Sequence, residues 1–217
     1  MPEQIEYITV VEPVLEVSLI GNASRESWQS LIQKENLVVE GNTLEIILSA
    51  VSAKYMGIPF RELSVSLRLN EDEFFLIHAY NSLWWFALAE RKFFRTPYYS
   101  ADIQVAPHYI QLSKGQNRVF EAKLADATKV IEDTAERNTW KIHLPRKLRK
   151  QAHQAHCFHA ILEGATQYYD LASLQTTVST QGHSEAVFAT LAQSDFTVRQ
   201  WLVREKARHS KSKTMVE

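Results

Sequence analysis

The sequence predicts a single α+β domain dominated by a curled, partly closed antiparallel or mixed sheet with flanking helices. Short runs of alternating apolar and polar residues, separated by turn residues, recur through most of the chain and are typical of strands joined by hairpins. Apolar residues at helical spacing are confined to an N-terminal segment, residues 82–95 and the C-terminal part. No Pro/Gly/Ser-rich linker or internal repeat marks a boundary, so residues 1–205 are expected to form one domain.

The composition argues against several classes of partner. Lys and Arg total 24 against 25 for Asp and Glu, which leaves no broad basic field for nucleic acid or an anionic membrane. The longest apolar run, LWWFALA, is far shorter than the ~20 residues that span a bilayer. The single cysteine, Cys157, cannot form an internal disulfide, and the N-terminus lacks a secretory pattern. We therefore expect a cytoplasmic protein with no nucleic-acid or membrane partner.

In the first half of the chain, one strand is expected before a helix and two hairpins are expected after it. VLEVSLI at 14–20 is typical of a strand, and NASRESWQSLIQKEN has helical spacing behind Asn22 or Ser24 as the cap. Two segments then pair β-rich runs around turn residues, at 37–56 and 64–80. Both are predicted to be hairpins.

The second half is expected to continue with strands, two helical segments and a tail. The segments are a hairpin at 111–124, a strand at 139–145, strands at 156–171 with a turn at EGAT, and helical spacing at 184–193 and 196–207. Residues 206–217 are expected to form a disordered C-terminal tail.

Residues 82–105 are predicted to form a helix followed by a strand. Asn81 or Ser82 can cap a helix over LWWFALAERKFF, and Thr96, which precedes Pro97, is pushed out of the helical region. Beyond Pro97 the residues alternate between two faces of a strand. One face carries Tyr99, Ala101, Ile103 and Val105, and the other carries Tyr98, Ser100, Asp102 and Gln104.

A second strand, after Pro59-Phe60, has the same division into an apolar and a polar face. The apolar row is Leu63, Val65, Leu67 and Leu69, and the polar row is Glu62, Ser64, Ser66 and Arg68. In one interpretation both polar rows face solvent, as in any half-exposed antiparallel sheet. In the other the sheet curls, the polar rows line a cavity and helices cover the apolar faces. The sequence leaves both interpretations open.

The segment FRTPYYSADI (94–103) resembles the acetoacetate decarboxylase signature, in which a helix leads to Trp-Gly-x-Pro-Lys-Lys-x-Ala-x-Ile. Upstream, YMGIPFRE (55–62) is similar to that family's Gly, aromatic, x, Glu segment. The resemblance covers residues 44–110 and is only loosely traceable elsewhere. Within the superfamily, Pro-Tyr in place of Pro-Lys-Lys is most similar to a group of unassigned function.

The resemblance implies an incomplete, cone-like β-barrel with its chemistry inside. In the decarboxylases the first lysine of the pair forms a Schiff base with a β-keto acid, after its pKa has been lowered by desolvation and a neighbouring cation. Here Tyr98 stands at the reactive position and Tyr99 at the neighbouring one. A phenol cannot form an imine, so acetoacetate decarboxylase activity is not expected.

The candidate catalytic residues are Tyr98, which can donate or accept a hydrogen bond, and Glu62, which is carried over from the family's Glu segment as an acid/base. The candidate ligand-binding residues are Tyr99, Arg68, His78 and Ser100. In the competing interpretation both tyrosines are amphipathic strand residues and His78 is a core histidine.

Other chemistry-bearing segments are assigned structural roles. His153, His156, Cys157 and His159 are metal-capable, but no single conformation gathers all four, so neither a metal nor a cofactor is expected. The basic runs at 145–151 and in the tail are expected to be solvated, and the Trp84-Trp85-Phe86 rings to pack against the sheet.

The predicted function is binding of a small carbonyl or carboxylate compound inside the barrel. If the protein is an enzyme, the expected chemistry is lyase-like or acid/base, through Tyr98 and Glu62, without a Schiff base. The alternative is a non-enzymatic interaction module that keeps the scaffold without a usable pocket. A third interpretation restores imine chemistry through a displaced lysine, with Lys54 the nearest candidate. Whether the chain forms a homo-oligomer is left open.

Overall fold

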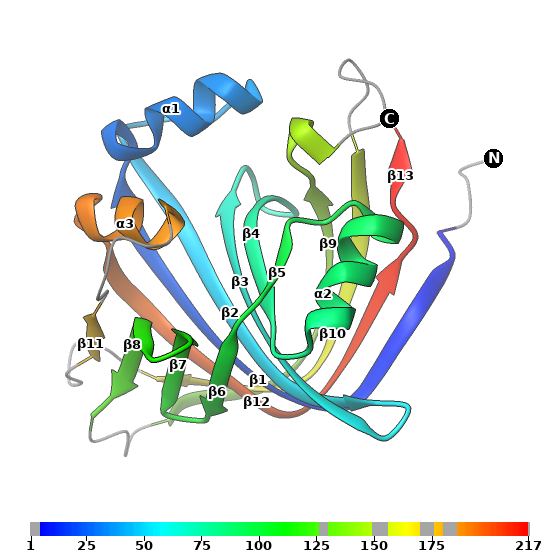
Figure 1. Ribbon diagram of the computed structural model, residues 1–217. Helices are drawn as coiled ribbons and strands as arrows, with labels where there is room; N and C mark the ends of the chain where they lie inside the picture. Colours follow the sequence, from blue (N-terminus) through cyan, green and yellow to red (C-terminus); the bar gives the residue numbers. More distant parts are fainter. Residues whose placement is uncertain (1–4, 126–129, 149–155, 170–175, 180–185, 217) are drawn as a thin grey trace.

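The computed structural model describes residues 5–125, 130–148, 156–169, 176–179 and 186–216. Its largest element is one strongly curled sheet (Figure 1). The strands of this sheet are β1 (Tyr7–Ser24), β2 (Thr43–Tyr55), β3 (Ile58–Arg68), β4 (Glu73–Asn81), β5 (Tyr98–Ser100), β9 (Val130–His143), β10 (His156–Tyr169), β12 (Thr197–Ser212) and β13 (Met215–Val216).

The curled sheet closes on itself. The pairing order β12-β1-β2-β3-β4-β9-β10 returns to β12, because β10 pairs with β12 as well as with β9. Neighbouring strands are antiparallel except around β4, which pairs in parallel with β5 and β9. The strands are not spaced evenly round one axis. The predicted α+β fold with a curled, incomplete barrel is therefore confirmed.

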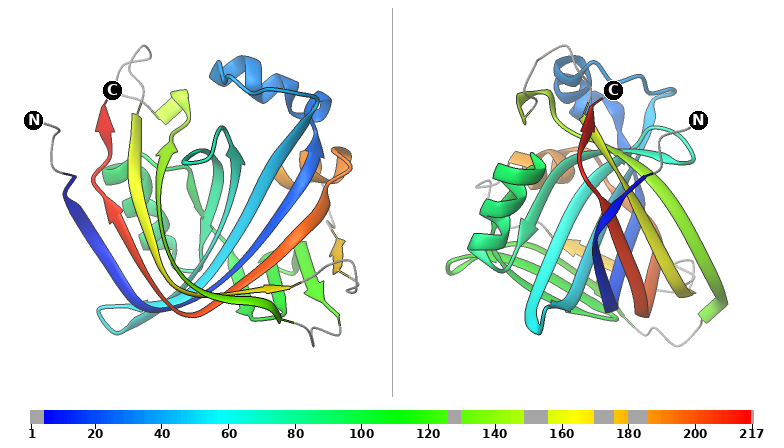
Figure 2. Two further views of the ribbon diagram at one scale, coloured as in Figure 1. Left: turned by 180° about the vertical axis from the view of Figure 1, so that it is seen from behind. Right: turned by 90° about the vertical axis from the view of Figure 1, so that its right-hand side faces the viewer.

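A smaller sheet and two helices lie against one face of the curled sheet (Figure 2). These elements are β6 (Asp102–Ala106), β7 (Tyr109–Lys114), β8 (Asn117–Leu124), β11 (Thr176–Ser179), α1 (Arg25–Glu35) and α3 (Ala186–Gln193). The main apolar core lies between them and the curled sheet; in it the Phe188 ring stacks on Phe120 at 5.1 Å and on Tyr80 at 5.9 Å. Burial of these aromatic and aliphatic side chains fixes the sheet's apolar face.

The other face of the curled sheet is partly covered by α2 (Trp84–Ala89), which continues into the π-helical turn η1 (Glu90–Phe94). Arg95 has a left-handed backbone, with φ 56°, and Pro97 leads into β5, so the helix ends where the sequence predicts. Its first turn begins after Leu83, whose backbone N–H donates to the Asn81 side chain at 2.8 Å. A short 3₁₀ turn, η2 (Arg146–Leu148), follows β9.

Several predicted elements are confirmed, among them α1, α3 and the hairpins β3–β4 and β7–β8. The hairpin predicted at 37–56 is wrong. Residues 37–42 contain no strand, and β2 pairs with β1 and β3 instead. No helix among the described residues has the length and apolar character needed to cross a membrane.

Three expectations about the C-terminal half are also wrong. EGAT does not form a turn, because β10 runs unbroken through Gly164, which has φ 155° and lies so near Ala207 that a Cβ would be 3.1 Å from its Cα. The segment 196–207 is not helical, since β12 covers most of it. The same strand includes residues 206–212, so these are ordered rather than part of a disordered tail.

Candidate functional site

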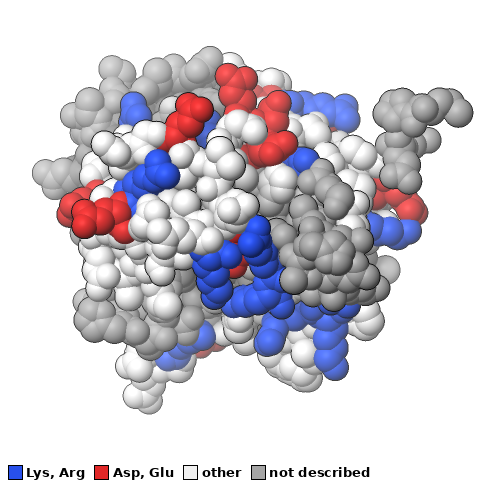
Figure 3. Space-filling view, turned by 90° about the horizontal axis from the view of Figure 1, so that it is seen from above, with Lys and Arg blue, Asp and Glu red and all other residues white. Residues whose placement is uncertain are grey.

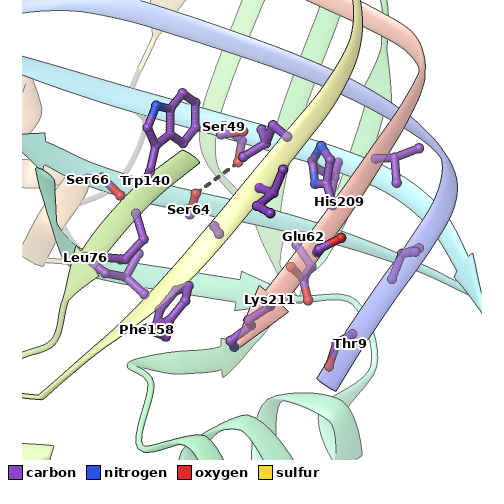
Figure 4. Close-up of a pocket in the computed structure, with 18 of the residues that line it drawn as sticks. Thr9, Ser49, Glu62, Ser64, Ser66, Leu76, Trp140, Phe158, His209 and Lys211 are labelled. Carbon is purple, nitrogen blue, oxygen red and sulfur yellow. Dashed lines mark hydrogen bonds between the residues drawn. The ribbon is translucent and has the colours of Figure 1, made fainter. Parts of the chain in front are cut away.

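A cavity of about 220 Å³ lies between the inner face of the curled sheet and η1 (Figure 4). Most of its wall is apolar and includes Ile47, Leu76 and Phe158. The polar side chains that reach it come from β1, β2, β3, η1, β5 and β12; among them are Glu62, Ser64, Glu90, Tyr98, His209 and Lys211. An apolar cavity with a few converging polar groups is the usual form of a small-molecule site.

The alternation of β3 explains how polar side chains reach this cavity. Leu63, Val65 and Leu67 are fully buried in the main core on one face of the strand. Because successive side chains point to opposite faces, Glu62, Ser64 and Ser66 must point to the other face, and all three line the cavity. Of the two interpretations left open by the sequence, the lined cavity is correct for these three residues, but not for Arg68 at the end of the row, which does not line the cavity.

Glu62 is held by two hydrogen bonds at the cavity wall. Asn81 Nδ2 donates to its Oε1 at 2.7 Å, and the Tyr98 hydroxyl donates to its Oε2 at 3.0 Å. The residue is partly exposed, but its carboxyl group is enclosed by protein atoms. Burial, reinforced by the negative charge of Glu90, raises the pKa of Glu62 to about 7, against the opposing effect of Lys211 and the two hydrogen bonds. Near neutral pH this carboxyl can therefore act as an acid or a base.

Tyr98 is positioned by β5, which is anchored in parallel to β4. Tyr98 pairs with Ala79, whose backbone N–H donates to the Pro97 carbonyl at 3.0 Å. The side chain is 9% exposed, and burial together with the nearby charges of Glu62 and Glu90 raises the Tyr98 pKa well above its usual value of 10. Its hydroxyl therefore stays neutral and remains a hydrogen-bond donor.

Lys211 contributes an ammonium group to the same region of the cavity (Figure 4). Its Nζ lies 2.5 Å from Glu90 Oε2, which also accepts a hydrogen bond from Thr96 Oγ1 at 2.7 Å. Three aromatic rings surround the ammonium, with centroids at 4.7 Å for Phe158, 4.9 Å for Phe94 and 5.6 Å for Tyr98. The ion pair and the cation–π contacts together fix the position of this charge.

His209, also on β12, connects the cavity to a buried charge network. Its Nε2 lies 3.0 Å from Glu16 Oε2, and Arg204 binds the same carboxylate at 3.1 Å and Glu136 at 2.8 Å. Burial alone would raise the Glu16 pKa, but the hydrogen bond and charge of His209 and the charge of Arg204 lower it to about 2. The network thus holds a charged carboxylate beneath the cavity wall.

The structure brings the two predicted catalytic residues together, whereas the four predicted ligand-binding residues lie elsewhere. Tyr99 faces the main core and stacks on His78 with ring centroids 4.5 Å apart. Arg68 pairs with Glu45 at 2.7 Å, and Ser100 is exposed. None of these four belongs to the cavity lining found among the described residues.

Sequence reasoning missed three titratable residues of the cavity, Glu90, His209 and Lys211. The last two were placed in an expected tail, and no apolar alternation in that stretch indicates a strand. Lys54, the lysine named as a displaced imine-forming candidate, is exposed on β2 and is not among the residues that line the cavity. The lysine that does line it is Lys211.

No group of three or more His, Cys, Asp or Glu residues that could hold a metal ion is found in the described part of the chain. Of the HQAHCFH cluster, His153 lies outside the described residues, and Cys157 is a buried cysteine on β10 that is not part of a disulfide. What the cavity offers chemically is one carboxyl group with a pKa near neutrality, one phenol donor, one paired ammonium and one imidazole.

Neither a protein-family model nor a curated protein matches the sequence. Solved structures do match. An acetoacetate decarboxylase from Legionella pneumophila subsp. pneumophila str. Philadelphia 1 aligns with a TM-score of 0.65 and 10% identity, covering 100% of this chain and 92% of that one. A second structure, described as from structural studies of acetoacetate decarboxylase, aligns with a TM-score of 0.61 and 12% identity over 100% of this chain and 90% of its own.

An acetoacetate decarboxylase-like enzyme from Sphingomonas wittichii RW1 aligns with a TM-score of 0.56 and 11% identity, covering 95% of this chain and 92% of that chain. At such low identity the shared property is the arrangement of the backbone, and residue roles do not transfer with it. The chain therefore has the acetoacetate decarboxylase-like fold.

Proposed function

We propose that this protein binds a small organic compound carrying a carbonyl or carboxylate group in the cavity beside Glu62. The observation that carries the proposal is a carboxyl group with a pKa of about 7, hydrogen-bonded to the Tyr98 phenol at 3.0 Å on the wall of a largely apolar cavity. Strongly perturbed carboxyl groups in concave sites are more common at functional positions than elsewhere. The volume, about 220 Å³, is below the roughly 300–1,000 Å³ of drug-sized sites and suits a small metabolite.

Different polar groups of the cavity would bind the carbonyl group and the carboxylate group of the ligand. The single O–H of Tyr98 donates to Glu62 in the absence of a ligand. When Glu62 is protonated, its own O–H can donate to the Tyr98 oxygen instead, and the phenol can then donate to a ligand's carbonyl oxygen and polarise it. The Lys211 ammonium can bind the carboxylate of a ligand, either while it stays paired with Glu90 or after it leaves Glu90 for the ligand. The apolar wall then encloses the hydrocarbon part of the ligand.

Any catalysis at this site would be non-covalent acid/base chemistry without an imine. A lysine attacks a carbonyl only as the neutral amine, and Lys211 is engaged in an ion pair with Glu90 at 2.5 Å. A carboxyl group with a pKa close to the working pH is well suited to transfer a proton in either direction. The class of reaction would therefore be proton transfer next to a carbonyl group, including lyase-type bond cleavage.

The test is a calorimetric binding screen of small keto acids, simple carboxylates and neutral ketones. For a compound that binds, Tyr98→Phe should weaken affinity about fivefold, the value of one hydrogen bond of roughly 1 kcal/mol. Lys211→Met should weaken the binding of carboxylates by roughly 10-fold or more and leave the binding of neutral ketones nearly unchanged. Ser100→Ala is the matched control, because Ser100 follows the tyrosines but is exposed outside the cavity.

Two outcomes would overturn the proposal. If no compound of these classes binds, the interaction-module alternative is left standing. If binding occurs but Tyr98→Phe and Lys211→Met behave like Ser100→Ala, the ligand site lies elsewhere in the molecule.

A further inference from the structure

An exposed apolar surface is formed by α2, η1 and the turn between β2 and β3. Met56 is 85% exposed, Phe93 77% and Trp84 66%, and three further large apolar side chains are about 40% exposed. The expectation that the aromatic rings of α2 pack against the sheet is therefore wrong for Trp84. We call these residues the α2 surface; they are Met56, Ile58, Trp84, Trp85, Leu88 and Phe93.

The helix α2 packs against the turn between β2 and β3. Phe86, on the inner side of α2, contacts the rings of Tyr55 and Phe60 with centroids 5.9 and 5.5 Å apart. Arg61 and Ser82 are joined by two hydrogen bonds of 2.8 Å. The Arg61 backbone N–H donates to the Ser82 hydroxyl oxygen, and the Ser82 backbone N–H donates to the Arg61 carbonyl oxygen. Figure 2 shows α2 standing at the outer edge of the molecule, beside the curled sheet. The apolar side chains of the two segments are thus presented together.

Within the two segments that carry the α2 surface, the charged residues are almost all positive. In residues 54–61 and 83–95 the cations are Lys54, Arg61, Arg91, Lys92 and Arg95, and the only acidic residue is Glu90. The Glu90 carboxylate points inward, to Lys211 and the cavity, while the first four cations are exposed. This local excess is notable in a chain whose formal net charge is -1. Figure 3 also shows Lys and Arg gathered in one region of the upper face.

Large exposed apolar side chains bordered by cations are the composition of protein surfaces that lie on anionic bilayers. Trp and Phe favour the headgroup level, and Lys and Arg are attracted to acidic lipids. A second copy of the chain fits less well, since a two-fold contact would bring the same cations on both copies against each other. We propose that the α2 surface docks the protein peripherally on an anionic membrane surface. This inference does not depend on the ligand proposed for the cavity.

The experiment is co-flotation of the full chain with vesicles of phosphatidylcholine alone or mixed with phosphatidylserine. We expect binding to the mixed vesicles only, weakened by added salt because surface charges are screened. Binding should shift tryptophan emission to the blue, and Trp84→Phe should reduce this shift. Arg91→Glu/Lys92→Glu should weaken binding by roughly 25-fold or more, since each basic residue near the surface contributes about fivefold. Trp84→Ala/Phe93→Ala should also weaken it.

Matched controls separate this surface from general effects of charge or stability. Lys34→Glu/Lys206→Glu reverses two exposed lysines on α1 and β12, and Val38→Ala removes an apolar side chain that is 85% exposed elsewhere. These variants should bind like the original protein, and all variants should retain its melting temperature.

Four results would overturn the proposal. The first is no binding to mixed vesicles, and the second is equal weakening by the control variants. The third is self-association in light scattering that Trp84→Ala/Phe93→Ala abolishes, without vesicle binding, which would assign the surface to a second copy. Capture of polyglutamate with the same dependence on Arg91 and Lys92, in place of vesicles, would point to an acidic protein and would equally contradict membrane docking.

Discussion

Replacement of Glu62 by Gln should make the protein more stable at alkaline pH, and the size of the effect follows from the site. The carboxyl group has a pKa of about 7 in the folded protein and an ordinary value of 4.5. Below pH 4.5 the group is protonated in both folded and unfolded chains, so it has no pH-dependent effect. As pH rises from 4.5 to 7 the unfolded chain ionises first, which favours unfolding, and above 7 the loss reaches a plateau of roughly 3 kcal/mol.

Glu62→Gln removes this titration while it keeps the side chain's size. The difference in free energy of unfolding between variant and original protein should therefore shift in favour of the variant by about 3 kcal/mol between pH 4.5 and pH 8. Urea denaturation across this range measures it, and the comparison cancels the other titrating groups. Ser100→Ala, which changes no ionisable group at an exposed residue, is the control and should give a difference that does not change with pH. A pH-independent difference for Glu62→Gln would refute the assigned pKa.

Two further predictions concern the scaffold. Arg204→Met should destabilise the protein by about 3–5 kcal/mol in urea denaturation at neutral pH, because it removes the buried guanidinium that pairs with the Glu16 and Glu136 carboxylates; a loss below 1 kcal/mol would contradict this. Gly21→Ala should cost roughly 1–3 kcal/mol, because a Cβ there would lie 2.5 Å from the Thr197 carbonyl oxygen; an unchanged melting temperature would mean that β12 moves aside freely.

The parts of the fold that the sequence predicted are those with apolar alternation or clear turns. The β3–β4 hairpin has alternating leucine and valine residues and a polar turn, and the structure contains the predicted strands and their pairing. The C-terminal half of β12 was missed because its buried side chains are mostly polar. Arg204, Ser210 and Ser212 are 3%, 8% and 1% exposed, and buried polar residues of this kind look like a solvated tail in the sequence.

The site could be predicted only in part, because its residues depend on strand positions that the sequence did not indicate. The pairing of Tyr98 with Glu62 came from a family resemblance, and strand alternation then decides which neighbours share the cavity. Tyr99 is one residue further along β5 and so faces the main core, where it meets His78. Lys211 could not be placed before β12 was known to be a strand. Long-range pairing, rather than local propensity, brings its ammonium next to Glu90.

The most direct test of the central claim is borohydride trapping with small keto acids such as acetoacetate. The protein is incubated with each compound, reduced and measured by intact mass, with an active acetoacetate decarboxylase trapped in parallel. We predict an unchanged mass for this protein, because Lys211, the lysine that lines the cavity in the described part of the chain, is paired with Glu90. A single adduct that maps to Lys211 would contradict it and would show that this cavity performs imine chemistry from β12.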